Sequence, residues 1–378
     1  MPSCLMNIAV NTQLLIKDRL EGIGWFAFET LRRMVTAHPE HRFFFIFDRA
    51  WDPSFVFADN VVPLRTTLPS RHPVLWYARF HHVIPRLLKK HAIDLFYSPD
   101  GFSIPGTFPS VVALHDLNFM HFPENLPPLT RAYYRRFFPA HARNARRIIT
   151  VSEFSRQDIA RSCGIDPDRI DVVYNGAGEA FRPLTPGEVS RVRRDHAEGK
   201  PYFLFVGALN PRKNLQRLIQ AFGKFCRQDD SGIRLLIVGE AMFGKSFYNP
   251  AVSDPGCRER IRFTGRLGRE ELARVMGGAL ALVLPSTFEG FGIPIVEAMA
   301  CDVPVITSHV SAMPEVAGDA ALLTDPWSVE SMAADLHRMA YDPELRARLV
   351  ARGRRQRMRF SWDATARAVW NTLDKSLH

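Results

Sequence analysis

Short apolar runs alternate along this chain with longer segments whose apolar residues recur at helical spacing. In the N-terminal half, Trp25–Val35 places Phe28, Leu31 and Val35 on one face of a predicted helix. The predicted buried strands of this half are Asn7–Val10, Phe43–Phe47, Leu95–Tyr97, Val111–Leu114, Ile148–Val151 and Asp171–Val173. Continuous apolar strands separated by helices predict a parallel sheet that is covered on both faces.

The second half of the chain repeats this scheme. Its predicted strands are Tyr202–Val206, Leu235–Val238, Ile261–Phe263, Leu280–Leu284 and Val303–Ile306, with helices between them. Two such runs predict an α/β protein with two Rossmann-like, doubly wound domains. Ligands of open parallel sheets bind beyond the carboxyl ends of the strands, so we expect the two domains to face a central cleft.

Glycines and prolines gather at residues 176–187, ahead of a charged helix, and indicate a domain boundary. We therefore expect an N-terminal acceptor domain over residues 1–185 and a C-terminal donor domain over residues 186–360. Residues 361–378 have the pattern of a terminal helix, which we expect to pack back on the N-terminal domain.

Composition agrees with two globular domains. The 378 residues are 46% hydrophobic and 23% charged. Residues 1–10 lack the pattern of a secretory signal, so a cytoplasmic location is expected. The five cysteines are dispersed without a Cys-x-x-Cys pair, and we expect them to be reduced and to form no zinc site.

The net charge of +10 is unevenly distributed. Residues 71–91 carry Arg71 and four other cations with no acid, and residues 131–147 carry six arginines with no acid. Residues 346–359 carry seven arginines. Such segments fit nucleic acid, an anionic membrane surface or a phosphorylated substrate, and they also fit plain solvated helix faces.

The most informative segment is Ser286–Ala300, which directly follows the strand predicted at 280–284. Pro294 suits the first turn of a helix, which places Glu289 in the preceding loop and Glu297 inside that turn. One carboxylate can accept hydrogen bonds from two vicinal hydroxyls. Two carboxylates flanking a helix N-terminus therefore fit the two sugars of a nucleotide-sugar, with its phosphates at the helix end.

The spacing of Glu289 and Glu297 within this glycine- and proline-rich context resembles the signature of glycosyltransferase family 4, which comprises retaining enzymes of the GT-B fold. The resemblance implies that Glu289 binds hydroxyls of the transferred sugar and that Glu297 binds the ribose of the nucleotide. It also implies donor contacts from the residues between them, namely Gly290, Phe291, Gly292 and Ile293. The glycines permit close approach of the backbone to a ligand.

A second motif, Phe205–Leu215, follows the strand 202–206. A glycine at the strand end, Gly207, followed by the adjacent cations Arg212 and Lys213 suits a diphosphate. The family resemblance implies that both cations neutralise charge on the leaving nucleoside diphosphate. It further implies that the turn containing Gly265 and Leu267 meets the nucleobase through its backbone.

In the N-terminal half, Gly22 and Gly24 open the first helix, and His115 follows a buried strand. Each feature alone is also common in proteins for structural reasons. By the resemblance, the glycine-rich turn presents its amides to the donor phosphates or the acceptor. His115 is implied to contact the transferred hexose, with Asp116 as a candidate for orienting it. The resemblance extends from about residue 7 to residue 370.

These motifs together predict a retaining hexosyltransferase. No nucleophile of the enzyme is evident, which favours a same-face mechanism in which the leaving diphosphate takes the proton of the acceptor. No metal and no other cofactor are expected, because Arg212 and Lys213 supply the positive charge. The segment Asp166-Pro-Asp168 formally matches a metal-binding Asp-x-Asp, but we interpret it as a turn and cap.

GDP-mannose is the favoured donor, because the motif set resembles that of mannosyltransferases of polysaccharide assembly; a UDP-hexose is the alternative. The expected acceptor is a saccharide or a lipid-linked saccharide. Arg131–Phe138 and residues 76–91 both mix cations with aromatic residues, as interfacial helices do. We therefore expect peripheral contact with an anionic inner membrane surface.

Several other classes of protein stay open at this point. A nucleotide-sugar epimerase of related fold would use the same kind of donor site, and a noncatalytic scaffold would retain the fold alone. A nucleic-acid-binding protein would explain the charge but not Glu289 and Glu297, which would repel phosphate, so no nucleic acid partner is expected. An NAD-dependent dehydrogenase would need a third glycine where Ala27 stands.

Overall fold

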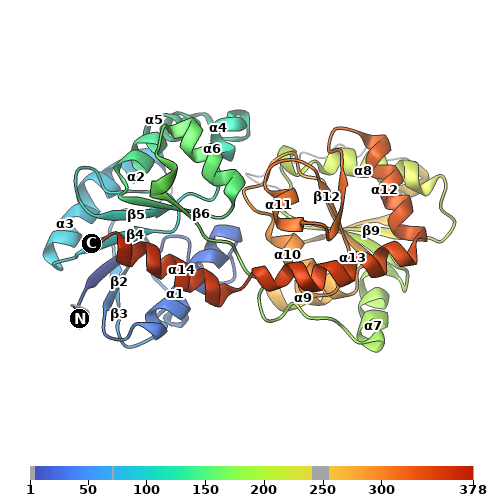
Figure 1. Cartoon of the computed structure of the whole chain (residues 1–378), viewed down its shortest axis with the longest axis horizontal. Helices are drawn as coiled ribbons and strands as arrows, with labels where there is room; N and C mark the ends of the chain where they lie inside the picture. The colour runs from blue at the N-terminus through green and yellow to red at the C-terminus, as the bar shows by residue number, and fades with distance from the viewer. Residues whose placement is uncertain (1–4, 70–71, 241–254, 378) are drawn as a thin grey trace. The chain divides into compact units, whose positions relative to one another are not determined.

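The computed structural model describes residues 5–69, 72–240 and 255–377 (Figure 1). Arg71 and Cys4, which entered the sequence analysis, lie outside these ranges. The chain divides into two compact units. Unit 1 contains Met1–Asn175 and Ser361–His378, and unit 2 contains Gly176–Phe360.

Unit 1 is built on a parallel sheet of seven strands in the order β3-β2-β1-β4-β5-β6-β7. The strands are β1 (Asn7–Asn11), β2 (Arg42–Phe47), β3 (Val61–Arg65), β4 (Leu95–Ser98), β5 (Ser110–Ala113), β6 (Arg147–Thr150) and β7 (Ile170–Val172). The central strands are buried almost throughout, because helices cover both of their faces. The strand order reverses between β1 and β4, which makes this pair the switch point of the sheet.

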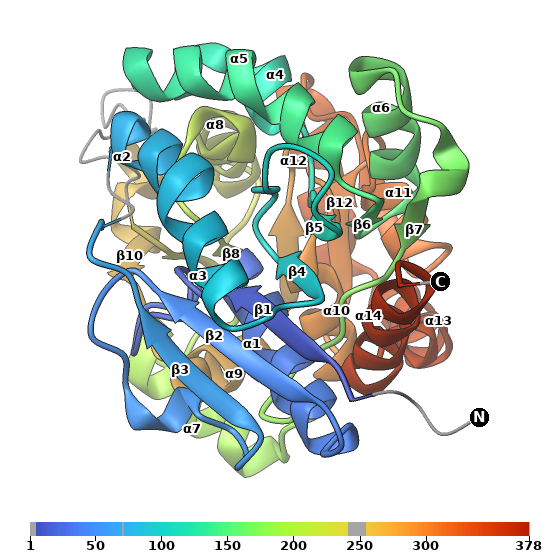
Figure 2. The same ribbon diagram turned by 90° about the vertical axis from the view of Figure 1, so that its left-hand side faces the viewer.

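The helices of unit 1 form two layers (Figures 1 and 2). They are α1 (Gly22–Ala37), α2 (Pro73–Ala78), α3 (Ile84–Lys90), α4 (Asn118–His121), α5 (Pro128–Asn144), α6 (Glu153–Cys163) and α14 (Trp362–Lys375). Helices α1 and α14 pack together on one face of the sheet. On the other face, Phe80, Ile84, Phe138 and Ile159 pack with side chains of the strands in one hydrophobic core.

Unit 2 contains a parallel sheet of six strands in the order β10-β9-β8-β11-β12-β13. The strands are β8 (Tyr202–Val206), β9 (Arg234–Val238), β10 (Ile261–Gly265), β11 (Ala281–Leu284), β12 (Val305–Ser308) and β13 (Ala321–Thr324). The order reverses between β8 and β11, so this sheet also has a switch point at its centre.

The helices of unit 2 are α7 (Pro186–Ala197), α8 (Leu215–Cys226), α9 (Arg269–Gly277), α10 (Ile293–Ala300), α11 (Met313–Ala317), α12 (Val329–Tyr341) and α13 (Pro343–Gln356). Side chains of α8, α12 and α13 share one core with the sheet, for example Phe222, Leu336 and Leu349 with Phe205 and Val283. Helix α10 packs on β11 and on its neighbours α9 and α11.

The two Rossmann-like domains predicted from the sequence are confirmed. The division falls after Asn175, earlier than the boundary placed at residue 185, and the terminal helix α14 is grouped with unit 1. The strands β3 and β13 were not predicted. Both are edge strands, and β3 contains Pro63, which a central strand would not tolerate. Within the described residues, no helix has the length and apolar character that a membrane crossing requires.

The cysteines correct the expectation that all are reduced. Cys226, at the end of α8, forms a disulfide with Cys257, and their Cα atoms are 6.1 Å apart. Cys163 and Cys301 are buried and free. The pair is separated by 31 residues, so its spacing has no recognisable signature in the sequence. The folding of α8 against the turn that contains Cys257 brings the two together.

Candidate functional site

The switch point of unit 2 gathers three of the predicted site residues. Arg212 and Lys213 lie in a short 3₁₀ turn, Pro211–Lys213, that follows β8. Glu289 lies in the loop between β11 and α10. Because β8 and β11 are the neighbours at which the strand order reverses, the loops that follow them stand where open α/β sheets commonly bind ligands.

Glu289 is held between the two cations. Its Oε2 is 2.8 Å from Nη1 of Arg212, and its Oε1 is 2.6 Å from Nζ of Lys213. Ser286 donates its hydroxyl to Oε1 of Glu289 at 2.7 Å. We call Arg212, Lys213, Glu289 and Ser286 the charge cluster. With two cations and one carboxylate it carries one net positive charge, a suitable environment for a polyanion.

The carboxyl of Glu289 is ionised over the whole physiological range. Its burial opposes ionisation, since the side chain is only 7% exposed. The charges of Arg212 and Lys213, together with the hydrogen bonds from Lys213 and Ser286, outweigh burial and lower the pKa of Glu289 to about 2. Glu289 is therefore a permanent acceptor of hydrogen bonds and no proton donor.

Backbone contacts fix the two loops against each other. The side chain of Asn210 caps the turn by accepting from the amide of Lys213 at 3.2 Å. The amide of Thr287 donates to the carbonyl of Arg212 at 2.8 Å, and Arg212 donates to the carbonyl of Phe288 at 2.7 Å. The amide of Glu289 donates to the hydroxyl of Ser311 at 3.0 Å. The charge cluster is thus preorganised by its own main chain.

Asn214 connects this loop to a third strand end. Its backbone is in the left-handed conformation, with φ of 61°, directly before α8. Its buried side-chain amide donates to the carbonyls of Pro285 and Pro326, at 3.0 and 2.6 Å. The loops that follow β8, β11 and β13 are joined in this way.

Glu297 lies on α10, one residue beyond the first turn in which it was predicted. Its side chain is buried, and burial raises its pKa to about 7, while the charge of Arg269 opposes this rise only in part. Arg269 begins α9 and lies against Gly178, where a Cβ atom would come within 1.8 Å of the guanidinium. Glu297 and Glu289 thus have very different proton affinities, although both are buried.

The glycines of unit 2 mark close approaches of the backbone. Gly292 immediately precedes α10 with φ of +95°, a conformation that favours glycine. Gly207 follows β8, and its carbonyl oxygen would lie 1.9 Å from a Cβ atom at Gly239, the residue after β9. Gly265 ends β10 and accepts from the amide of Gly239 at 3.0 Å. Gly207, Gly239 and Gly265 therefore line neighbouring strand ends of the sheet.

The rest of the predicted donor loop lies around the start of α10. Gly290 and Phe291 are buried, and Ile293 is the first residue of the helix. Phe291 meets Phe360 edge-to-face, with ring centroids 5.6 Å apart. Leu267 lies in the loop between β10 and α9 and is half-buried. The aromatic packing of Phe291 shows a structural role for it, beside the donor contact that the resemblance implies.

In unit 1, His115 follows β5 and points toward the end of β4. Its Nε2 lies 2.9 Å from the carbonyl oxygen of Pro99, and its ring meets Phe26 edge-to-face at 4.8 Å. Burial lowers its pKa, so the neutral ring donates through Nε2 and keeps a lone pair on Nδ1. Such a ring can accept a hydrogen bond from a hydroxyl. Asp116, the candidate for orienting it, instead accepts from the amide of Asn118 at 2.9 Å.

Gly22 and Gly24 are the first and third residues of α1 and do not form a separate loop. A Cβ atom at Gly24 would lie 3.2 Å from the carbonyl oxygen of Leu14 and 3.3 Å from the side chain of Leu20. The segment between β1 and α1 therefore packs tightly against the helix start at this glycine. This packing explains Gly24 structurally, and the amide role implied by the resemblance stays a prediction.

A polar cluster at the switch point of unit 1 was missed from the sequence. Asp100, just after β4, accepts from Asn11 at 2.9 Å, from Ser98 at 2.6 Å and from Gln13. Arg79 is fully buried and donates to the side chain of Asn11 at 3.3 Å. Asn11 ends β1, so β1 and β4 supply this cluster as β8 and β11 supply the charge cluster. We call Asn11, Gln13, Asp100 and Arg79 the Asp100 cluster.

Burial raises the pKa of Asp100, and the hydrogen bonds from Ser98, Asn11 and Gln13 oppose that rise. Burial also lowers the pKa of Arg79 to about 10, against the charges of Asp48 and Asp100. Arg79 therefore stays charged at neutral pH and compensates the carboxylate. Asp100 is separated by 89 residues from Asn11, so no local sequence motif indicates the cluster. The only indication in the sequence is that a polar residue stands at the end of each of two strands, and the sequence does not show that these strands are neighbours.

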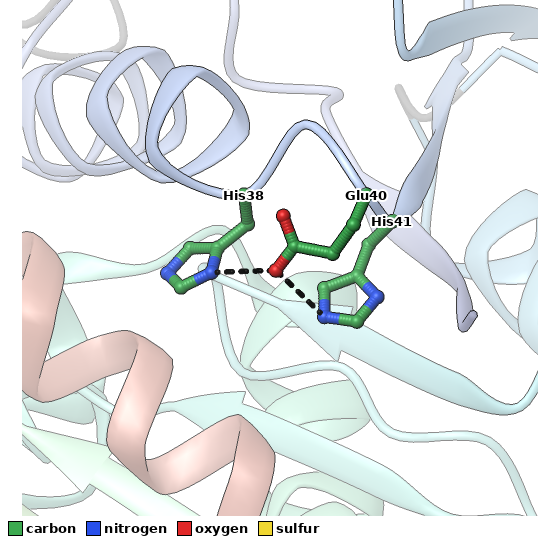
Figure 3. A group of neighbouring side chains, drawn as sticks. All are labelled: His38, Glu40 and His41. Atoms are coloured by element: carbon green, nitrogen blue, oxygen red, sulfur yellow. Dashed lines mark hydrogen bonds and ion pairs between the residues drawn. The ribbon is translucent and has the colours of Figure 1, made fainter. Parts of the chain in front are cut away.

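One group of side chains has the composition of a metal site (Figure 3). His38, Glu40 and His41 offer ligand atoms that lie within 4.8 Å of one another. However, the amide of Met6 donates to Nδ1 of His41 at 3.3 Å, so the proton of this neutral ring resides on Nε2, the atom that faces Glu40. A metal ion beside Glu40 would need a lone pair on Nε2 of His41, where the neutral ring carries its proton.

Both histidine rings also stack on Trp370 of α14, with centroids 3.7 Å away for His38 and 5.1 Å for His41. This stacking explains why the two histidines lie close together: they pack the turn after α1 against α14. The other metal-like pattern, Asp166-Pro-Asp168, forms a capped turn in which Asp166 accepts from the amide of Asp168 at 2.9 Å.

The fold and these clusters define the class of the protein. Two parallel-sheet Rossmann-like units, with a cationic loop and a buried carboxylate at the switch point of the second, are the architecture of a GT-B glycosyltransferase. Residues 188–356 match the family model "Glycosyl transferases group 1", and residues 21–178 match "Glycosyltransferase Family 4". The chain belongs to glycosyltransferase family 4.

The similar curated proteins include mannosyltransferases. The chain is 32% identical to the O-antigen chain mannosyltransferase B of Escherichia coli over 273 residues, which cover 71% of each chain. It is 25% identical to the O-antigen chain mannosyltransferase RfbU of Salmonella typhimurium over 84% of each chain. Among solved structures, WaaG, a glycosyltransferase involved in lipopolysaccharide biosynthesis, matches 97% of this chain and 99% of its own with a TM-score of 0.75 and 17% identity.

Proposed function

We propose that this glycosyltransferase moves a hexosyl group from a nucleoside diphosphate sugar to an acceptor hydroxyl, with retention of the anomeric configuration. The observation that carries the proposal is the charge cluster, in which Arg212 and Lys213 are fixed beside Glu289 at the switch point of unit 2. This arrangement offers cations for a diphosphate and an ionised carboxylate for sugar hydroxyls within one loop pair.

The proposed reaction breaks the bond between the anomeric carbon and the diphosphate oxygen and forms a bond from that carbon to the acceptor oxygen. The acceptor proton goes to the leaving diphosphate on the same face of the sugar. Arg212 and Lys213 stabilise the charge that develops on the diphosphate. Glu289 and His115 orient the hexose through hydrogen bonds to its hydroxyls, and neither attacks it.

Glu297 is the proposed ligand of the ribose. Its position on α10 follows the loop that contains Glu289, and a carboxylate can accept from both ribose hydroxyls. Gly207, Gly265, Leu267 and the loop Gly290–Ile293 complete the proposed donor site through their backbone, and Gly22 and Gly24 present amides at the start of α1. The phosphates are proposed to need no metal and no further cofactor, because the two cations supply the charge.

GDP-mannose is the proposed donor. The supporting observation is that two of the most similar curated proteins are named mannosyltransferases of the O-antigen chain. A UDP-hexose is the alternative donor. The acceptor is proposed to be a saccharide or a lipid-linked saccharide, and contact with an anionic membrane surface would bring the enzyme to the lipid-linked form. No role for nucleic acid is proposed.

The Asp100 cluster is the proposed acceptor-binding element. It lies at the switch point of its own sheet, where α/β sheets bind ligands, and the Oε1 atom of the buried Gln13 makes no hydrogen bond within the described structure. Hydrogen bonds from Ser98, Asn11 and Gln13 hold the carboxyl of Asp100 in place, and together with the charge of Arg79 they oppose the rise in pKa that burial causes. An ordered carboxylate of this kind can position an acceptor hydroxyl.

Transfer is tested by incubating the enzyme with each nucleotide-sugar and a saccharide acceptor in the presence of a chelator. Released nucleotide reports turnover, and the one-bond carbon–hydrogen coupling at the anomeric centre of the product reports configuration by NMR. Turnover with GDP-mannose and an α-configured product is expected. An inverted product would overturn retention, and complete loss of turnover with the chelator would overturn metal independence.

Asp100→Asn separates acceptor binding from donor binding. We expect kcat/KM for the acceptor to fall by roughly tenfold to a hundredfold, because the amide cannot replace the charge-assisted hydrogen bond. The affinity for GDP should stay unchanged in a direct titration. A loss of GDP affinity together with normal acceptor kinetics would contradict the assignment.

A further inference from the structure

Unit 2 has a cavity at the edge of its sheet opposite to the charge cluster. The cavity has a volume of about 640 Å³, which lies in the range of small-molecule sites. The charge cluster follows β8 and β11, so the whole length of these strands separates it from the cavity. Four of the lining residues directly precede parallel strands, namely Pro201 before β8, Ile233 before β9, Leu280 before β11 and Pro304 before β12.

Two arginines line the cavity from two different helices. Arg193 belongs to α7 and Arg346 to α13, and both helices are labelled in unit 2 (Figure 1). Ser231 and Tyr341 add hydroxyl groups, and the other lining side chains are apolar. Among the described residues that line the cavity, none is an aspartate or a glutamate. The cavity therefore combines an apolar wall with positive charge alone.

Each guanidinium is anchored to the main chain and keeps donors for a ligand. Nε of Arg193 donates to the carbonyl of Gly278 at 3.1 Å. Nη1 of Arg346 donates to the carbonyls of Met339 and Ala340 at the end of α12, at 2.7 and 2.8 Å. Within the described residues, neither arginine forms an ion pair, and Nη2 of each makes no hydrogen bond. Because a guanidinium has five N–H donors, both arginines can bind an anion without giving up these anchors.

The charge of Arg193 is partly removed from water. Burial lowers the pKa of Arg193, and the phenol of Tyr202 opposes this shift. The folded protein thus holds a half-buried cation without a carboxylate beside it, which costs free energy. An anion in the cavity would offset that cost.

The carboxylate closest in contact to the cavity wall is already compensated. Asp229 accepts hydrogen bonds from the hydroxyls of Ser231 and Tyr341, and it forms an ion pair with Arg260. Its side chain is fully buried. Since both hydroxyl protons are directed to Asp229, the arginines are the charged donors that the cavity offers to a ligand.

We propose that this cavity binds a phosphate monoester of a small organic molecule. Arg193 and Arg346 donate to the phosphate, whose three oxygens can accept from two guanidinium groups at once. The organic part lies against the apolar wall, to which Ile233, Leu280 and Val350 contribute. The ligand does not compete with a nucleotide at the charge cluster, because the two places lie at opposite edges of the sheet. The inference does not depend on the proposed transfer reaction.

Isothermal titration of the full chain tests the proposal. The probe is phenyl phosphate, which carries one phosphate and an apolar ring, and inorganic phosphate and phenol each lack one of these parts. Phenyl phosphate should bind at one site per chain, at least about tenfold more tightly than inorganic phosphate, because the ring is buried. Phenol should not bind measurably. An excess of GDP should leave the dissociation constant of phenyl phosphate within about a factor of two.

Substitutions in the cavity should weaken binding selectively. Arg193→Gln and Arg346→Gln should each raise the dissociation constant at least about tenfold, since each removes a charge-assisted hydrogen bond. The matched controls Arg191→Gln on α7 and Arg348→Gln on α13 remove the same charge from exposed arginines that do not line the cavity. These controls should change the dissociation constant by less than about twofold. Ala347→Trp occupies the cavity from an exposed position, so it should abolish binding while both arginines remain.

Melting temperatures show whether each variant is folded, and Ala347→Trp tests the site without removing the main-chain anchors of the arginines. The proposal is wrong if phenyl phosphate binds no more tightly than inorganic phosphate, or if a folded Ala347→Trp variant binds it as wild type does. Equal losses in the cavity variants and in their controls would show an effect of net charge alone. Binding that GDP abolishes would place phenyl phosphate at the charge cluster and would also overturn the proposal.

Discussion

At the scale of single residues, Glu289 combines two properties that usually exclude each other, because it is buried and yet fully ionised. Arg212 and Lys213 make this combination possible, and Ser286 fixes the orientation of the carboxylate. The same contacts keep both cations in place at the end of β8. Removing one charge therefore disturbs all three groups, and function and stability should change together.

Glu289→Gln leaves Arg212 and Lys213 without their common partner in a poorly solvated place. We expect a loss of about 3 kcal/mol in the free energy of unfolding and a fall in kcat of roughly a hundredfold or more, since the sugar loses its positioning group. Urea unfolding and a transfer assay measure the two effects. The matched control is Glu188→Gln, whose partner Arg182 is exposed. Equal effects of both substitutions would contradict the role of the charge cluster.

Glu297 should make nucleotide binding depend on pH. Burial raises its folded pKa from the ordinary 4.5 to about 7, so the folded state takes up a proton more readily than the unfolded chain. The resulting stabilisation is present below about pH 4.5 and is lost as the pH rises to 7. The carboxylate that accepts from the ribose forms over the same interval, so GDP should bind more tightly at pH 8 than at pH 6.

Glu297→Gln should remove both pH dependences. The variant should bind GDP more weakly than wild type at pH 8, and its unfolding free energy should change less between pH 5 and pH 8. Isothermal titration and urea unfolding at each pH check these outcomes. A wild-type pH dependence that persists in the variant would assign it to another group.

The sequence was informative about single residues only where they share a local motif. Arg212 and Lys213 are adjacent, and Glu289 and Glu297 stand in one continuous segment, so their types and spacing could be recognised. The pairing of Glu289 with both cations could not be predicted, because it depends on how the loops after β8 and β11 meet. Asn11 and Asp100 were missed for the same reason, since only the sheet brings them together.

At the scale of elements, the start of α10 depends on one backbone conformation. Gly292 caps the helix at φ of +95°, and a side chain there would approach Ile295 to 3.0 Å. Pro294 then begins the helix with its φ already set. Pro294 was predicted to lie in the first turn of the helix, which is confirmed, whereas Gly292 was interpreted as permitting close approach to a ligand, and its positive φ was not predicted. The edge strands β3 and β13, both of which are partly exposed, were missed.

Gly292→Ala should destabilise unit 2 by about 1–2 kcal/mol, because alanine disfavours this region and its Cβ crowds Ile295. The matched control is Gly187→Ala in the first turn of α7, where a Cβ would meet nothing within 4 Å. Urea unfolding should show the loss for the first variant and little change for the second. A Gly292→Ala variant as stable as wild type would show that the helix start does not need glycine.

At the scale of the whole molecule, the two units share one sheet topology. Each unit is a parallel sheet whose order reverses between two central strands, and in each the loops after those strands carry a charged cluster. The alternation of apolar runs with helical segments predicted the two parallel sheets, because buried parallel strands need continuous apolar sequence. The expected return of the terminal helix agrees with the grouping of α14 in unit 1, whereas the division falls after Asn175 instead of residue 185, because glycines and prolines are spread over residues 176–187 and single out no one position.

The most direct test of the donor site is the melting temperature of the protein with GDP, UDP and ADP, each alone and as its sugar conjugate. A ligand that binds only the folded state raises the melting temperature by mass action. The account predicts a shift of several degrees with one nucleotide class, GDP, which is lost in Glu297→Ala and kept in the surface control Glu344→Ala. No shift with any nucleotide, or an equal shift in Glu297→Ala, would contradict a nucleotide-sugar site built around the charge cluster and α10.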